Sequence, residues 1–86
     1  MTTLIERTLR TQREQLKLAH NERFTKGEYE FRLIYEGGLA ESFAILARKQ
    51  GERNFHYFDG FSAYKFYTTE QVLAFAKAQA SQRLGL

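Results

Sequence analysis

Residues 29–36 read Tyr-Glu-Phe-Arg-Leu-Ile-Tyr-Glu, and Gly37-Gly38 separates them from residues 42–48, Ser-Phe-Ala-Ile-Leu-Ala-Arg. In both stretches every second side chain is apolar, a period that is typical of a β-strand with one face in the core. The glycine pair supplies the backbone freedom that a tight reversal needs, and strands joined by a short turn must pair antiparallel. This stretch therefore predicts an antiparallel hairpin. The expected inward residues are Tyr29, Phe31, Leu33, Tyr35, Phe43, Ile45 and Ala47.

The chain after this hairpin predicts one or two further strands. Residues 49–52, Lys-Gln-Gly-Glu, suit a turn, and a third strand is expected from about residue 53 to residue 58. Asp59-Gly60 is a strong short-range signal for a hairpin turn. Residues 61–67 are then interpreted as a fourth strand or as an extended segment that leads into the next helix.

Two helices are expected to flank the strands. Residues 3–23 carry a stripe with a period of 3.5, formed by Ile5, Leu9, Gln12, Leu16 and Ala19. Residues 69–84 predict the second helix, in which Thr68 and Gln71 fit a capping box and Gly85 fits the C-terminal cap. The fold class that follows is α+β in two layers. An antiparallel sheet of three or four strands would be flanked by an N-terminal and a C-terminal helix (α-β-β-β-(β)-α), in a single domain over residues 1–86.

The composition argues against several classes of function. The 86 residues include no Cys and two isolated His residues, which excludes disulfides and thiolate metal sites and leaves little material for an imidazole site. No Ser lies in a pattern with His and a carboxylate that would activate it as a nucleophile. We therefore expect no catalytic residue, no metal site and no cofactor, and the protein is predicted not to be an enzyme.

Hydropathy and the N-terminal sequence predict where the protein acts. The longest apolar runs are a few residues, whereas a membrane-spanning helix needs about 20. The first residues, Met-Thr-Thr-Leu-Ile-Glu-Arg, do not have the charged-then-apolar layout of a secretory signal. The expectation is a cytoplasmic protein without a membrane partner.

Residues 53–67 are the most informative segment for function, because seven of these fifteen residues are aromatic. In a strand one set of side chains faces the core, so rings on the other set must point outward. Exposed rings beside basic residues suit a protein interface, in which Tyr, Phe and Arg are enriched. Leu4 and Leu18 lie on a second side of the first predicted helix, where they favour a partner or a symmetric homodimer. The predicted protein-binding residues are Leu4, Leu18, Arg53, Tyr57, Tyr64, Lys65 and Tyr67.

These features predict a small non-enzymatic protein-binding module, an adaptor or an inhibitor that masks a partner's surface. The build, a short chain without catalytic groups, resembles that of phage and mobile-element proteins that disable host defences, anti-CRISPR proteins included. The alternative is a nucleic-acid-binding module, because the net charge of +3 equals the basic excess of residues 1–26. In that alternative the tyrosines would stack on bases, and the phosphate-binding residues would be Arg7, Arg10, Arg13 and Lys17.

Overall fold

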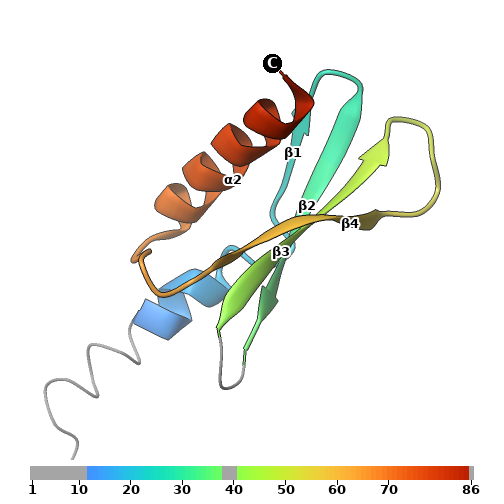
Figure 1. The fold of residues 1–86 in the computed structure, drawn as a ribbon. Helices are drawn as coiled ribbons and strands as arrows, with labels where there is room; N and C mark the ends of the chain where they lie inside the picture. The colour runs from blue at the N-terminus through green and yellow to red at the C-terminus, as the bar shows by residue number, and fades with distance from the viewer. Residues whose placement is uncertain (1–11, 38–40, 86) are drawn as a thin grey trace, which may run out of the picture.

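The computed structural model describes residues 12–37 and 41–85 of the chain. Residues 12–17 are helical, and they are followed by β1 (Arg23–Lys26), β2 (Tyr29–Glu36), β3 (Ser42–Lys49), β4 (His56–Ser62) and α2 (Thr69–Leu84) (Figure 1). The four strands form one antiparallel sheet, and an N-terminal and a C-terminal helical segment flank it. This arrangement confirms the predicted α+β class.

The strand order in the sheet is the order in the sequence, β1-β2-β3-β4. The central pair is the predicted hairpin, in which Tyr29 lies opposite Lys49 and Glu36 lies opposite Ser42. The turn over residues 49–52 is also confirmed, and Gly51 adopts a φ of 95° there. Gly38, half of the glycine pair, lies outside the described residues.

One hydrophobic core joins the helical segments to one face of the sheet. Phe31, Leu33, Phe43 and Ile45 from β2 and β3 are at most 1% exposed. They pack in one cluster with Leu16 and Ala19 from the N-terminal segment and with Val72, Ala76 and Ala80 from α2. The alanines let α2 lie close to the sheet, and Figure 1 shows the C-terminal end of this helix beside β1. The side chains on the other strand positions must therefore point away from the helices.

The N-terminal helix ends earlier than the sequence pattern predicted. The helical residues stop at Lys17, and Arg23, the expected last helical residue, opens β1 instead. The last turn tightens through bonds from Ala19 N–H to Leu16 O and from His20 N–H to Lys17 O. Asn21 then takes a left-handed backbone with a φ of 70°, which Asn tolerates better than most residues, and its N–H donates to Leu33 O in β2. The predicted cap at Thr3 lies outside the described residues.

The predicted hairpin turn at Asp59-Gly60 is wrong. Both residues lie inside β4, where Asp59 pairs with Ile45 and Gly60 pairs with Ala44. The register shifts between Ile45 and Leu46, so β4 carries an irregularity one residue before Asp59. The strand expected from about residue 53 to residue 58 is instead β4 over residues 56–62. Residues 63–68 form no strand and lead into α2, and the fourth strand of the sheet is β1.

The C-terminal helix is confirmed together with both of its caps. The Thr68 hydroxyl accepts from Gln71 N–H at 3.1 Å, and the Gln71 side chain accepts from Thr68 N–H at 3.3 Å. Gly85 ends the helix in the left-handed conformation with a φ of 74°. No helix in residues 12–37 or 41–85 is long and apolar enough to cross a membrane.

Candidate protein-binding surface

The face of the sheet that points away from the core is called the outer face here. Both described helical segments contribute to the core on the opposite face, so neither of them covers it. Its side chains follow from the strand register, which places Arg32 beside Leu46, Ile34 beside Ala44 and Glu30 beside Arg48. The outer face comprises Arg23, Thr25, Glu30, Arg32, Ile34, Glu36, Ser42, Ala44, Leu46, Arg48, Tyr57, Gly60 and Ser62.

The centre of the outer face is apolar. Ile34 and Leu46 are half-buried although no described helix packs on them, and Ala44 between them is 5% exposed. Tyr57 pairs with Leu46 across β3 and β4 and is 70% exposed. An aliphatic centre with an exposed tyrosine on one side is typical of a protein interface.

Arginines lie at one end of this centre. Arg23 and Arg32 are paired across β1 and β2. The Arg48 guanidinium lies over the ring of Phe55, with its Cζ atom 4.2 Å from the ring centroid, and Arg23 Cζ is 5.6 Å from the same centroid. Arg48 also donates from Nη1 to Arg53 O at 3.1 Å, so the backbone of Arg53 lies beside this end of the face.

Three of the residues predicted from sequence lie in a different place. Tyr64, Lys65 and Tyr67 belong to the segment between β4 and α2, and both tyrosines are 60% exposed. Gln12 Nε2 holds this segment by donating to Tyr64 O at 3.2 Å and to Phe66 O at 2.6 Å. Lys65 Nζ lies 4.4 Å from the Phe75 ring centroid, so it is directed toward α2 rather than toward the outer face.

The structure therefore divides the predicted interface. Tyr57 lies on the outer face, and the backbone of Arg53 lies beside it at Arg48. Tyr64, Lys65 and Tyr67 lie near the start of α2, and Leu18 is 63% exposed just after the N-terminal helical residues. Leu4 lies outside the described residues, as do Arg7 and Arg10 from the nucleic-acid alternative. Of the other two basic residues in that alternative, Lys17 is exposed and Arg13 is bound in an ion pair.

That ion pair joins Arg13 to Glu41, a buried carboxylate directly before β3. Arg13 Nε lies 2.5 Å from Glu41 Oε1, and the side chains are 59% and 9% exposed. The backbone N–H of Glu41 also donates to the Tyr64 hydroxyl at 3.4 Å. Burial raises the pKa of Tyr35, and the charge of Glu41 raises it further. This cluster connects the N-terminal helical residues to β2 and to the start of β3.

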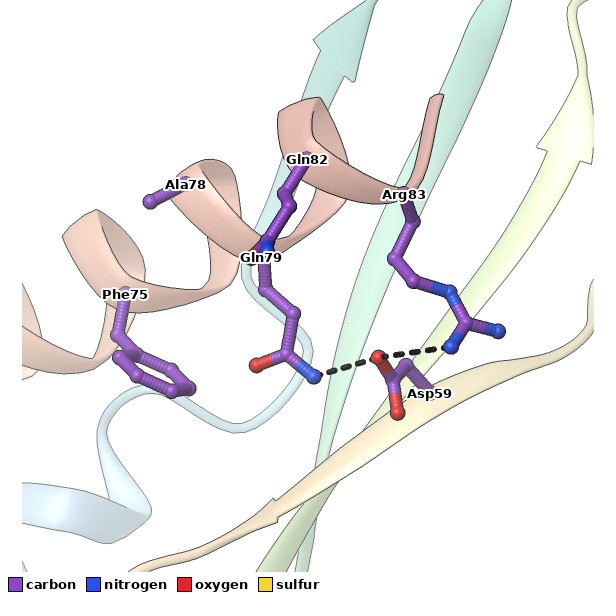
Figure 2. Close-up of a pocket in the computed structure, with 6 residues that line it drawn as sticks. All are labelled: Asp59, Phe75, Ala78, Gln79, Gln82 and Arg83. Carbon is purple, nitrogen blue, oxygen red and sulfur yellow. Dashed lines mark hydrogen bonds and ion pairs between the residues drawn. The ribbon is translucent and has the colours of Figure 1, made fainter. Parts of the chain in front are cut away.

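The second carboxylate with several partners is Asp59, which faces α2 from β4. Figure 2 shows Gln79 and Arg83 reaching from α2 toward it. The hydrogen bond from Gln79 is the main cause that lowers the pKa of Asp59, and a bond from Gly60 N–H and the charge of Arg83 lower it further. These residues line an open groove of about 510 Å³ that Phe75, Ala78 and Gln82 complete. Asp59 is occupied by its own neighbours, so the groove positions α2 on β4 and has no free acid or base.

The two histidines lie far apart in the fold. His56 is exposed at the start of β4. His20 lies in the turn after the helical residues, and its Nδ1 accepts from Tyr35 N–H at 2.9 Å. Within the ranges 12–37 and 41–85, no three His, Asp or Glu residues form a group that could hold a metal ion.

Comparison of the chain with protein-family models, with curated proteins and with solved structures found no match.

Proposed function

We propose that the protein is a non-enzymatic binding module that docks onto a partner protein with the outer face of its sheet. The observation that carries this proposal is the composition of that face, in which Ile34, Ala44, Leu46 and Tyr57 form an apolar centre beside arginines. Protein interfaces share this anatomy, with an apolar core, a polar rim and an enrichment in Tyr and Arg. An adaptor or an inhibitor acting in the cytoplasm, of the kind that phages and other mobile elements encode, is the form of this function that we favour.

The open edge of β4 is less suited to a partner than the outer face. An unpaired edge strand offers N–H and C=O groups to a strand from another chain. In β4, however, Gly60 N–H already donates to Asp59 Oδ1 at 2.8 Å, and the register shift interrupts the regular ladder. Both features hinder the addition of a strand, so docking onto the face is the better-supported mode.

Nucleic acid as the partner has less support. Binding through phosphates needs basic side chains that are free to replace counterions. Arg13, however, pairs with Glu41, Arg48 pairs with Glu30 and Lys49 pairs with Glu28.

The test is affinity capture from a nuclease-treated extract of the native host, with bound proteins identified by mass spectrometry. Leu46→Glu would place a carboxylate in the apolar centre, and Lys77→Glu on the exposed side of α2 is the matched control. We expect the wild type and Lys77→Glu to retain the same partner and Leu46→Glu to bind it at least about tenfold more weakly. Circular dichroism would verify that both variants are folded. A partner that stays bound to Leu46→Glu, or the retention of no protein beyond a tag-only control, would contradict the proposal.

A further inference from the structure

Four arginines gather at one end of the outer face, and they are called the arginine end here. Arg23 and Arg32 reach this end from β1 and β2, Arg48 reaches it from β3, and Arg53 lies in the loop before β4. Two of the four meet at one ring, because Arg23 and Arg48 both lie within cation–π distance of Phe55. The strand register places the end beside Leu46, the direct neighbour of Arg32. Guanidinium groups thus adjoin the apolar centre.

Positive charge exceeds negative charge at the arginine end. Among the outer-face residues of this end the one carboxylate is Glu30, and it is paired with Arg48 Nε at 2.5 Å. Arg32 donates to the amide oxygen of Asn21, which is a neutral partner. Within the described residues the guanidinium of Arg23 has no ion-pair partner, and its contact is with the Phe55 ring. An occupant of this end is therefore expected to carry negative charge.

Several of these side chains are held in place before anything binds. Arg32 Nε donates to Asn21 Oδ1 at 2.9 Å, and Arg48 is fixed by Glu30, by Arg53 O and by Phe55. Arg32 also donates from Nη2 to Asn21 Oδ1, so its Nη1 group is left to meet a ligand. A fixed guanidinium loses little rotamer entropy when it pairs with a carboxylate.

The rings of this end favour a protein segment over a single nucleic-acid strand. Binding of single strands uses successive aromatic rings on which bases stack. Phe55 is half-buried and already has the Arg48 guanidinium over its face, which leaves Tyr57 as the exposed ring of the outer face. Beside it, Leu46 and Ile34 offer an aliphatic surface that suits an aliphatic side chain.

We propose that the arginine end binds an acidic segment of the partner protein, in which carboxylates pair with Arg23, Arg32 and Arg53 while an aliphatic side chain packs on Leu46. This inference rests on the proposed function and adds the chemistry of the partner to it. The proposed ligand groups are carboxylates. Binding of nucleic acid through its phosphates would contradict the proposal, and the test below includes it.

The experiment measures fluorescence anisotropy with three labelled probes. The first is a peptide of about twelve residues in which Asp-Glu pairs alternate with single leucines, the second replaces every acid by its amide, and the third is an oligothymidine of similar length. The carboxylate peptide is expected to bind the wild type at least about tenfold more tightly than the amide peptide and the oligothymidine. Its affinity should fall as salt is raised, because exposed ion pairs are screened.

Variants assign the binding to the arginine end. Arg23→Gln removes a guanidinium that makes no hydrogen bond within the described residues, so the fold should tolerate it, and Lys77→Gln removes one positive charge from α2 as the matched control. We expect Arg23→Gln combined with Arg53→Gln to weaken the carboxylate peptide about tenfold and Lys77→Gln to leave it unchanged. Equal affinity for acid and amide peptides, tighter binding of oligothymidine, or the same loss in Lys77→Gln would overturn the inference. If host capture still depends on Leu46 in that case, the proposed function stands and only the acidic partner is lost.

Discussion

The hydroxyl of Tyr57 lies 2.8 Å from the point that a Cβ atom would occupy on Gly60. The same point is 3.2 Å from the backbone oxygen of Phe43. The glycine thus makes room for the tyrosine ring along the outer face of β4. Gly60 therefore serves close packing inside β4, and not the hairpin turn that the Asp59-Gly60 sequence predicted.

Replacement of Gly60 by Ala should destabilise the protein. Ala is better than Gly in a strand by about 0.5–1 kcal/mol, but the new methyl group would displace Tyr57 and press on the Phe43 carbonyl, which cannot rotate away. We expect a net loss of about 1 kcal/mol in the free energy of unfolding, measured by chemical denaturation. In a Tyr57→Ala background the same change should cost less, because one of the two contacts is gone. A Gly60→Ala protein more stable than wild type would refute this account of the site.

Replacement of Arg13 by Ala should cost more stability than replacement of the nearby Lys17. The change leaves the buried carboxylate of Glu41 without its ion pair, and an unpaired buried charge is expensive. Because Arg13 is itself more than half exposed, we expect about 1–2 kcal/mol rather than the larger values of fully buried pairs. Lys17→Ala, in the same exposed helical turn, should change the free energy of unfolding by less than about 0.5 kcal/mol. Thermal denaturation of both variants would measure the difference, and equal effects would contradict the role of the ion pair.

The link between Asp59 and Gln79 should make stability depend on pH in the acid range. The pKa of Asp59 is lowered in the folded protein from its ordinary 3.8, so the ionised carboxylate favours folding above that value. This contribution is lost as the pH falls through the lowered pKa. Gln79→Ala removes the main cause of the shift and should cost about 1 kcal/mol at pH near 6, and its deficit should shrink toward about pH 2.

Denaturation of the Gln79→Ala protein and of the wild type across that range would measure the trend. Gln82→Ala, a neighbour on the same helix with no bond to Asp59, is the control. A deficit of Gln79→Ala that stays constant down to the lowest pH would show that the carboxylate's charge is not involved.

The parts of the fold that the sequence predicted well are those in which one pattern persists over many residues. The alternation in β2 and β3 runs for eight residues in each strand, and the capping box of α2 is a local arrangement of Thr68 and Gln71. Leu16 and Ala19 were also expected on the inner side of the first helix, and both are buried. These patterns depend on residues close together in the sequence, so the local structure that they predict is also the structure in the folded protein.

The errors concern segments in which distant partners overrule a local signal. Residues 23–26 are too short to show a period of their own, and their pairing with β2 makes them a strand. Asp59-Gly60 is a good turn sequence, but the eight residues of β3 need a partner along their length, and β4 supplies it. Local propensity is a weak prior where tertiary pairing decides.

The candidate site was predicted only in part. The excess of rings in residues 53–67 suggested that some must face water, and Tyr57, Tyr64 and Tyr67 do. That Tyr57 lies apart from the other two depends on the end of β4, which was misplaced. The arginine end is formed by four segments of the chain that the sheet register brings together. The one sequence signal for it was the mixture of charged and apolar residues at 30–34 and 44–48.

The sheet order that follows the chain order has a consequence for how the molecule assembles. Each strand finds its partner through a loop of a few residues, so little chain entropy is lost before the first stabilising contacts form. The hairpins can therefore arise early and independently. The docking of α2 against β1 closes a loop that contains the whole sheet sequence, and the bond from Gln12 to Tyr64 O closes a loop of similar length, so we expect both contacts to form late. Until α2 docks, the sheet lacks the apolar side chains of Val72, Ala76 and Ala80 over its core face, so the four strands alone bury less apolar surface than the complete fold does.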